Sequence, residues 1–167
     1  MNPVYNKIII TGDAGRGKST LAEKLSMKLG IPCHSTDDYY YEFKFFKPRD
    51  RENALAQITK LYQEDRWIVE GTTAWLLKPG MEAADLIIHL RYKNIFHQWF
   101  TLFKRYLHRE EETLKGLLIL MRHVFYKRYG LGYKRGKMTH LEFVAPHKNK
   151  LITLSSFNEI DEFLNTL

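Results

Sequence analysis

A glycine-rich stretch near the start of the chain constrains the fold more than any other feature. In residues 8–25, IIITGDAGRGKSTLAEKL, three consecutive isoleucines precede the glycines, and leucines follow them at helical spacing. The isoleucine run is typical of a buried parallel strand, and Leu21, Leu25 and Leu29 predict the buried face of a helix. Between them, residues 12–19 match G-x-x-x-x-G-K-[ST] at every fixed position. The sequence therefore predicts a strand, a phosphate-binding loop (P-loop) and a helix in succession.

The P-loop predicts binding of ATP with Mg²⁺, because each fixed residue type has a chemical role. Its glycines allow positive φ, so that backbone N–H groups turn inward and, with the positive end of the following helix, form an anion cradle. Lys18 can reach the β- and γ-phosphates, and the Ser19 hydroxyl can ligate Mg²⁺. An accidental match is expected in under roughly 1% of chains this long, which disfavours an ordinary glycine loop. Arg16 is expected to face solvent. The predicted nucleotide-binding residues are Gly12, Asp13, Ala14, Gly15, Arg16, Gly17, Lys18, Ser19 and Thr20.

Length and composition predict one domain without a membrane partner. The chain has 167 residues, 44% of them hydrophobic, and its single cysteine, Cys33, excludes an internal disulfide. No signal peptide precedes the first predicted strand. The longest later apolar run, residues 117–121, is far too short to cross a bilayer. We therefore expect a single cytoplasmic domain over residues 1–167.

The net charge of +7 is unevenly distributed. Residues 1–90 carry 12 basic and 12 acidic side chains, whereas residues 91–150 carry 14 basic and 4 acidic ones. Residues 151–167 carry 3 acidic side chains and no basic one. A basic segment beside a phosphate site suits either a lid that closes on phosphates or a patch that binds nucleic acid.

Strand-like and helix-like segments alternate, which predicts an α/β fold. Five β segments separated by helices imply a five-stranded parallel sheet with right-handed crossovers. Ligands of such sheets lie beyond the carboxyl ends of the strands, which places Gly12, Asp37, Glu70 and Arg91 around one crevice. The predicted strands are 4–11, 31–36, 66–71, 84–90 and 149–154. The predicted helices are 18–29, 50–64 with Asp50 as its cap, 94–109, 110–129 and one after residue 154. The predicted apolar stripes of the two helices in the basic segment are Ile95, Trp99, Phe103 and Tyr106, then Leu114, Leu117, Met121, Val124 and Phe125.

The ends of these strands resemble one branch of the P-loop proteins. The stretch GDAGRGKSTLAEKLSMKLGIP, followed by TDDYY, WIVEGT and ADLIIHL, resembles nucleoside-monophosphate-kinase-like proteins. Within that branch it is most similar to bacterial adenylate-kinase-related proteins called DNA topology modulation proteins. The resemblance covers residues 4–110 well. It implies the strand order 2-3-1-4-5 and a helical, basic lid inserted at about residues 91–136.

The chain departs from the better-known kinases of this branch where they bind their acceptors. Adenylate kinases usually carry an acid-Gly-Phe-Pro-Arg stretch after the third strand, whereas residues 70–74 here are Glu-Gly-Thr-Thr-Ala. Shikimate kinases usually carry Asp-x-Asp after the second strand and three glycines after the third, and neither pattern is present. The resemblance in fold therefore does not identify the acceptor substrate.

Four side chains outside the P-loop are candidates for phosphoryl transfer. Asp37, after the second strand, can accept a substrate proton or hold a Mg²⁺-bound water, and Glu70, at the position of a Walker B acid, can do the latter. The alternative for both is a strand-end acid that caps the next helix or turn. Arg105 and Arg109 are four residues apart on one helix face, and lid arginines of adenylate kinases have a comparable spacing. Their alternative is a solvated basic face.

Two aromatic segments are weaker candidates. The segment YYYEFKFFKPR, residues 39–49, suits either an acceptor pocket, with Lys47 or Arg49 on a phosphate, or apolar cover for the sheet edge. Residues 155–157, after the fifth strand, lie where related folds hold the adenine base. The seven histidines show no metal-ligand spacing, so a zinc site is not expected.

Three classes of function remain open at this stage, and the least favoured is a basic amphipathic helix that binds a membrane surface. The favoured one is an ATP- and Mg²⁺-dependent kinase for a small molecule or nucleotide, in which the basic lid excludes water. The alternative is a nucleotide-regulated DNA-binding protein, as the name of the resembling family suggests. The basic segment supports it weakly, because no helix-turn-helix or zinc finger is recognisable.

Overall fold

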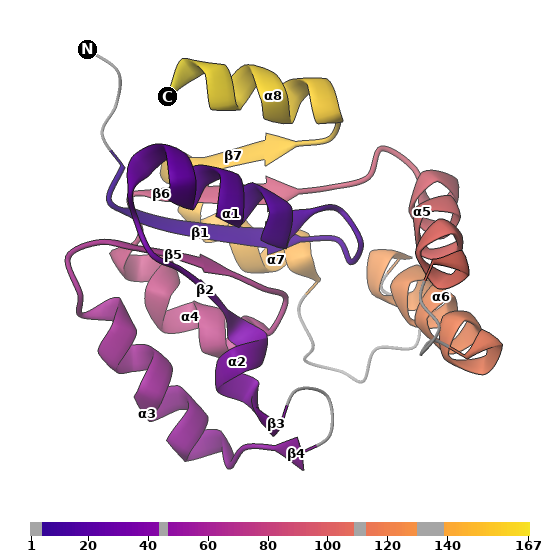
Figure 1. The fold of residues 1–167 in the computed structure, drawn as a ribbon, viewed down its shortest axis with the longest axis horizontal. Coiled ribbons are helices and arrows are strands. Elements are labelled where there is room, and N and C mark those ends of the chain that lie inside the picture. Colours follow the sequence, from indigo (N-terminus) through magenta and orange to yellow (C-terminus); the bar gives the residue numbers. More distant parts are fainter. Residues whose placement is uncertain (1–4, 44–46, 109–112, 130–138) are drawn as a thin grey trace.

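The fold is a parallel β-sheet covered by helices on both faces, with a helical pair projecting from one end (Figure 1). The computed structural model describes residues 5–43, 47–108, 113–129 and 139–167, and only the backbone at residues 43, 105, 127 and 140. In Figure 1, α1 and α8 lie on one side of the sheet and α3, α4 and α7 on the other. The helices α5 and α6 lie beyond the end of the sheet.

The five main strands are all parallel, as predicted, and follow the predicted order. They are β1 (Lys7–Gly12), β2 (Cys33–Ser35), β5 (Trp67–Glu70), β6 (Leu86–Leu90) and β7 (Leu151–Leu154). Their order across the sheet is β2-β5-β1-β6-β7, which is 2-3-1-4-5 when the parallel strands alone are numbered. The two remaining strands, β3 (Tyr41–Phe43) and β4 (Lys47–Pro48), form a separate antiparallel hairpin.

The helices follow the predicted alternation and add elements that the sequence analysis did not include. They are α1 (Lys18–Leu29), α2 (Thr36–Tyr40), α3 (Arg51–Tyr62), α4 (Ala74–Ala83), α5 (Ile95–Leu107), α6 (Leu114–Tyr129), α7 (His140–Val144) and α8 (Phe157–Thr166), with a 3₁₀ helix at Ala145–Lys150. The predicted cap of α3 is confirmed, because the Asp50 carboxylate accepts the backbone N–H groups of Glu52 and Asn53. The helix α4 was missed because Pro79 and Gly80 interrupt its pattern.

Alternation along β1 divides the core into two layers. Ile8 and Ile10 are fully buried against α1, and Ile9 is fully buried on the opposite side, against α3 and α4. Each such side chain contributes about 1.5–3 kcal/mol by its removal from water. Because both faces of β1 are apolar, the strand lies at the centre of the sheet. The P-loop follows its carboxyl end and therefore lies at the edge of the sheet where the parallel strands end.

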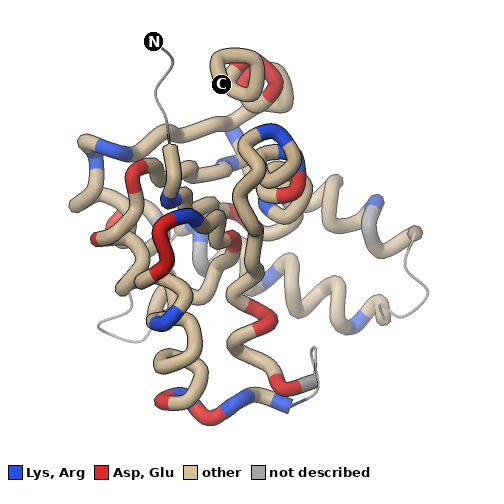
Figure 2. Tube along the Cα trace, turned by 60° about the vertical axis from the view of Figure 1, so that its left-hand side comes forward, with Lys and Arg blue, Asp and Glu red and all other residues tan. Residues whose placement is uncertain are grey.

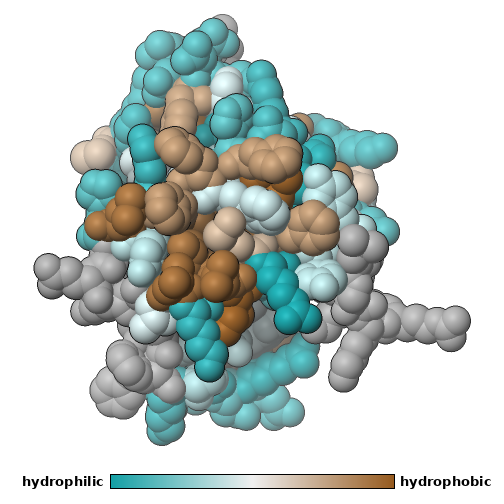
Figure 3. Space-filling model, turned by 90° about the vertical axis from the view of Figure 1, so that its right-hand side faces the viewer, coloured by the Kyte–Doolittle hydropathy of each residue, from teal (hydrophilic) through white to brown (hydrophobic). Residues whose placement is uncertain are grey.

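The helices α5 and α6 form a helical hairpin with a small core of its own. Ile95, Leu102, Leu117 and Val124 are buried together between the helices and the P-loop. Two predicted members of the apolar stripes are not in this core, since Phe103 and Leu114 are 45% and 56% exposed. The prediction was wrong there because each helix carries a second apolar stripe that is exposed. Figure 3 shows apolar side chains gathered on this end of the molecule.

The charged residues follow the division seen in the sequence. Figure 2 shows basic and acidic positions interspersed over the sheet and its covering helices, whereas α5 and α6, on the right of the picture, carry basic positions and no acidic ones. Among the helices of the described residues, none combines the length and apolar character that crossing a bilayer requires.

Candidate functional site

The P-loop turns as its glycines predict. Gly12, Gly15 and Gly17 have φ of 131°, 76° and 84°, values that other residues rarely adopt. A side chain at Gly12 would also collide with the backbone carbonyl group of Leu90 on the neighbouring strand. The last of these glycines is the N-cap of α1, so the positive end of α1 points at the loop. The loop therefore has the backbone geometry of an anion cradle.

Lys18 and Ser19 begin α1 and face the site as the motif predicts. The Lys18 ammonium group donates to the carbonyl oxygen of Asp13 across the loop, at 3.0 Å. The Ser19 hydroxyl donates to a carboxylate oxygen of Glu70 at 3.1 Å. Glu70 ends β5 and is buried. The predicted juxtaposition of the motif serine with the acid of the third parallel strand is therefore present in the structure.

This pair fits the role expected for Mg²⁺. A P-loop Mg²⁺ is bound by few protein groups together with waters and phosphate oxygens, so a hydroxyl beside one carboxylate is the donor set that the ion requires. Within the ranges that the structure describes, no group of three or more His, Cys, Asp or Glu side chains could hold a metal ion by itself. Ser19 and Glu70 could hold Mg²⁺ together with the phosphates of a bound nucleotide.

Replacing Ser19 with alanine should weaken Mg²⁺-dependent ATP binding by about 10- to 100-fold, the loss typical of a hydrogen-bonding group that faces a charge. Binding of ATP in EDTA should change much less, since the hydroxyl acts through the ion. Calorimetric titrations of ATP with and without Mg²⁺ measure both. Ser26→Ala, two turns further along α1, is the matched control. Equal losses with and without Mg²⁺ would remove Ser19 as a metal ligand.

Asp37 lies at the same edge of the sheet, in the first turn of α2. The strand β2 pairs with β5 so that Ser35 is opposite Glu70, and Asp37 follows two residues later. The Ser35 hydroxyl caps α2 by accepting the N–H group of Asp37, at 3.3 Å. The side-chain cap of α2 is therefore Ser35 and not Asp37. Gly71, just past Glu70, packs so closely on Thr36 that any side chain there would collide with it.

Three side chains fasten the P-loop to the segment after β6. The Tyr92 hydroxyl donates to the carbonyl oxygen of Gly15 at 2.8 Å, and the Gln98 amide donates to that of Ala14 at 3.2 Å. Arg16 donates to the carbonyl oxygen of Arg91 at 3.2 Å. The prediction that Arg16 faces solvent was wrong, since only 3% of it is exposed. Its guanidinium lies 5.0 Å from the ring centroid of Tyr92.

Asp13 connects the P-loop to α6. Its carboxylate accepts the backbone N–H group of Tyr92 at 2.9 Å and lies 3.6 Å from the Arg128 guanidinium. Arg128 also donates to the carbonyl oxygens of Tyr92 and Lys93, at 3.0 Å each. Arg128 was not among the predicted site residues. Its signal was present, because Leu117, Val124 and Arg128 share a helix face and Arg128 is the basic residue on the buried side of α6.

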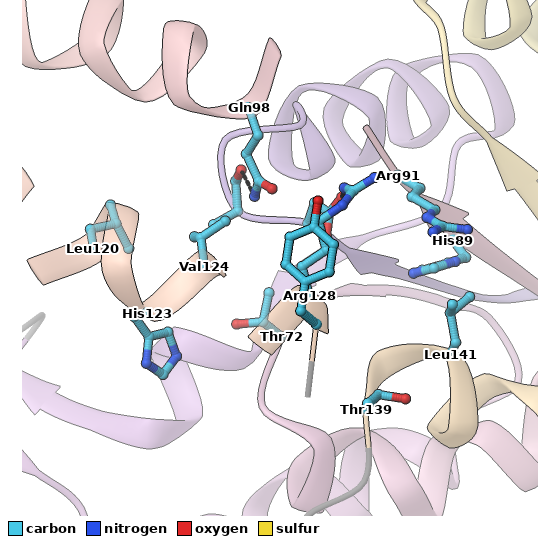
Figure 4. Close-up of a pocket in the computed structure, with 13 residues that line it drawn as sticks. Thr72, His89, Arg91, Gln98, Leu120, His123, Val124, Arg128, Thr139 and Leu141 are labelled. Atoms are coloured by element: carbon cyan, nitrogen blue, oxygen red, sulfur yellow. Dashed lines mark hydrogen bonds and ion pairs between the residues drawn. The ribbon is translucent and has the colours of Figure 1, made fainter. Parts of the chain in front are cut away.

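Beside this network lies a pocket of about 370 Å³, within the usual size range of small-molecule sites (Figure 4). The sheet edge contributes Thr72, His89 and Arg91, and α6 contributes His123 and Arg128. Asp13 and Ala14 bring the P-loop into the wall of the same pocket. A molecule held there would lie next to the phosphates of a nucleotide in the P-loop.

His89 contributes no charge to this pocket at neutral pH. Burial lowers its pKa below the ordinary value, the Asp13 carboxylate opposes this shift, and the cations of Arg91 and Lys18 add to it. The imidazole of His89 is therefore neutral near pH 7.

The described part of the aromatic segment after β2, residues 39–49, packs mainly against the core at the edge of the sheet. Tyr40 packs against the core, with its ring centroid 6.1 Å from that of Trp75. Arg49 donates to the carbonyl oxygens of Tyr39 and Tyr41, at 3.2 and 3.3 Å, and so holds the hairpin. No described residue of segment 37–49 lines the pocket. Of the two interpretations of this segment, apolar cover therefore accounts for its tyrosines.

Three further candidates have different outcomes. Arg109 lies outside the described residues, and Arg105 lies on α5 with only its backbone described. Phe157, at the start of α8, is 67% exposed and stacks on Arg16, with 4.5 Å between the guanidinium carbon and the ring centroid. This stacked pair lies beside the P-loop, where the sequence analysis expected the adenine base.

Comparison with known proteins supports the fold. No protein-family model and no curated protein sequence matches the chain. Among solved structures, a gluconokinase from Sinorhizobium meliloti 1021 is similar with a TM-score of 0.57 and 15% identity, over 96% of this chain and 88% of that one. The shikimate kinase from Acinetobacter baumannii in complex with shikimate has a TM-score of 0.55 and 14% identity, over 94% and 88%. The shikimate kinase from Bacteroides thetaiotaomicron has a TM-score of 0.55 and 17% identity, over 97% and 95%.

These likenesses establish the P-loop kinase fold. The identities are too low to transfer an activity, and they do not distinguish the branches of this fold from one another. The resemblance to DNA topology modulation proteins therefore stays a prediction.

Proposed function

We propose that the chain is an ATP- and Mg²⁺-dependent phosphotransferase that acts on a small-molecule acceptor. The observation that carries the proposal is the convergence of a complete P-loop, the Ser19–Glu70 pair and a pocket of about 370 Å³ at one edge of the sheet. Phosphoryl transfer depends mainly on positioning and on neutralising charge, and this edge offers groups for both.

Each residue has a distinct role in this proposal. The Lys18 ammonium group neutralises charge on the β- and γ-phosphates, for which it exchanges its contact with the carbonyl oxygen of Asp13. Ser19 and Glu70 hold the ion. Asp37 does not itself line the pocket, but it follows the strand that pairs with β5 at the Ser19–Glu70 pair. In this proposal it accepts the proton of an acceptor hydroxyl that extends from the pocket toward that pair.

The charges of the pocket favour an anionic occupant. Arg91 and Arg128 line it, and a planar guanidinium binds carboxylate or phosphate oxygens in a bidentate manner. We propose that Arg105 and Arg109 add to this charge from the lid when it closes. The acceptor is accordingly a small hydroxylated carboxylate or phosphate.

Duplex DNA, the alternative from sequence, has only the basic character of α5 and α6 in its favour among the described residues. Two of the arginines next to the phosphate site, Arg16 and Arg128, donate to backbone carbonyl groups of the chain itself. Both side chains are also largely buried, at 3% and 12% exposed, so neither belongs to a surface that a duplex could contact.

A coupled assay of ADP formation tests the proposal. Purified protein with ATP and Mg²⁺ should phosphorylate at least one member of a panel of hydroxy acids, sugar acids, nucleosides and nucleoside monophosphates. Turnover with that member should exceed the acceptor-free hydrolysis of ATP by at least about 10²-fold, because water is a poorly positioned nucleophile. The Lys18→Ala protein gives the background. Binding of ATP with no acceptor-dependent turnover across the panel would overturn the phosphotransferase proposal.

A further inference from the structure

The helix α5 carries a second apolar stripe that faces solvent. Phe96, Phe100, Phe103 and Leu107 recur at the spacing of one helix face and are 45–72% exposed. The buried stripe of the same helix, which includes Ile95 and Leu102, already packs on α6 and the P-loop. The exposed stripe is therefore not required for the core of the helical hairpin.

The helix α6 repeats this arrangement. Leu114, Leu118 and Tyr129 are 53–58% exposed, whereas Leu117 and Val124 are buried. The connection from α5 to α6 is short, and the Trp99 ring donates to the carbonyl oxygen of Met121 at 3.3 Å, as expected for an antiparallel pair.

Helix geometry places both exposed stripes on one face of the hairpin. Viewed along each helix from its N-terminus, the exposed stripe is rotated from the buried stripe by about a quarter to a third of a turn. The direction of this rotation is the same on both helices. In an antiparallel pair, equal rotations bring the two stripes to the same side. Figure 3 views this end of the molecule and shows the apolar side chains as one group. We call these seven side chains the hairpin patch: Phe96, Phe100, Phe103, Leu107, Leu114, Leu118 and Tyr129.

The size of the hairpin patch matches one half of a specific protein interface. With about 150–250 Å² for a large side chain, the exposed fractions of 45–72% amount to about 600–1,000 Å² on one copy. The largest apolar patch of a typical monomer is about 300–600 Å². A standard interface buries about 800 Å² on each partner.

We propose that the hairpin patch binds the hairpin patch of a second copy of this chain, so that two helical hairpins form a four-helix bundle. A hairpin with an apolar face is half of such a bundle, and a patch that pairs with itself satisfies the two-fold symmetry of most homodimers. The proposal is independent of the catalytic activity proposed above.

The charges around the patch give this dimer a distinctive salt dependence. Lys104 and Arg122 are exposed at its margins, 5.0 and 5.3 Å from the ring centroids of Phe100 and Tyr126. Neither α5 nor α6 contains an acidic residue. Where the basic margins of two copies meet, like charges come together, and added salt screens their repulsion. The glutamates at 110–112, in the connection between the two helices, lie outside the described residues. The dimer should tighten as salt rises, whereas adsorption of a basic amphipathic surface to an anionic bilayer should weaken.

Sedimentation velocity over a concentration series tests the proposal. The wild-type protein should sediment as a dimer in reversible equilibrium with the monomer, and the dimer fraction should rise with added NaCl. Phe100→Glu and Leu118→Glu, one on each helix, should each weaken dimerisation by at least about tenfold. Met27→Glu is the matched control, because Met27 is 78% exposed on α1, away from the hairpin. Thermal unfolding of every variant verifies that it is folded.

Three outcomes would overturn the proposal. One is a wild-type protein that stays monomeric at all concentrations and salt levels. Another is a dimer that tolerates both hairpin substitutions, or that Met27→Glu disrupts equally. The third is a monomer that co-sediments with phosphatidylglycerol vesicles through Phe100 and Leu118, which would assign the patch to a lipid surface.

Discussion

Replacing Lys18 with alanine is expected to reduce turnover of the true acceptor by about 10²- to 10³-fold, the usual effect of removing one preorganised group that stabilises developing charge. ATP affinity should fall as well, because the same ammonium group faces the phosphates in the ground state. The protein should stay folded, since the Lys18 ammonium group donates to a loop carbonyl oxygen and Lys18 is not a member of the apolar core clusters. Steady-state kinetics, calorimetric titration of ATP and thermal unfolding measure the three quantities.

Lys24→Ala is the control for Lys18. It removes the same charge from the same helix, but Lys24 lies near Asp161 on the outer surface, at 3.7 Å, with half of its side chain exposed. Turnover and ATP affinity should stay within about twofold of wild type, as expected for a surface position. If Lys18→Ala unfolds, or binds ATP as the wild type does, the role assigned to Lys18 is wrong.

Replacing Asp37 with asparagine should lower turnover by about 10²- to 10⁴-fold, the range for loss of a general base. Asparagine keeps the size and hydrogen-bonding reach of the side chain but cannot accept a proton, so ATP affinity should stay nearly unchanged. The helix α2 should also persist, because its cap is the hydroxyl of Ser35. Acceptor-dependent kinetics and calorimetry on one preparation separate the two effects.

Asp38→Asn is the matched comparison for Asp37, since it makes the same change at the next residue, which is exposed. Asp38→Asn should retain turnover within a few fold. A turnover number for Asp37→Asn equal to that of wild type would exclude the base role. A parallel loss in both variants would indicate that the charge of the segment matters and not the position of one carboxylate.

The fold was predictable where the local sequence pattern matches the burial of the same residues in the folded protein. Ile8 to Ile10 indicate a strand buried on both faces, and the structure buries all three completely. The helix α4 was not predictable in the same way, because its Pro79 and Gly80 are poor helix formers that tertiary packing accommodates. Gly80 lies directly against the ring of Tyr62, which leaves no room for a side chain. Only the position of α3 beside α4 reveals this reason for a glycine.

The chemistry of the motif was sufficient to predict the site, but it did not predict the contacts that support the site. Ser19 and Glu70 are far apart in sequence, and the rule that parallel strands end at one edge was sufficient to bring them together. Arg16 could not be placed in this way. Whether it faces solvent depends on the ring of Tyr92 and on the Arg91 carbonyl oxygen, and neither contact has a signature within the motif. Arg128 was not predicted because the stripe of Leu117 and Val124 was expected to consist of apolar residues alone, although Arg128 falls on the same helix face.

The bonds that Tyr92, Gln98 and Arg16 make around the P-loop have an entropic consequence for ligand affinity. Fixing a backbone costs about 1–2 kcal/mol per residue in conformational entropy. In this chain the loop carbonyl groups of Ala14 and Gly15 accept hydrogen bonds from side chains of the protein itself. That ordering cost is met when the chain folds and not when phosphate arrives, so the cradle is preorganised for its ligand. Side chains outside the P-loop, such as Tyr92 and Gln98, thereby contribute to the affinity for nucleotide phosphates. Replacing them should weaken nucleotide binding although the P-loop sequence itself is unchanged.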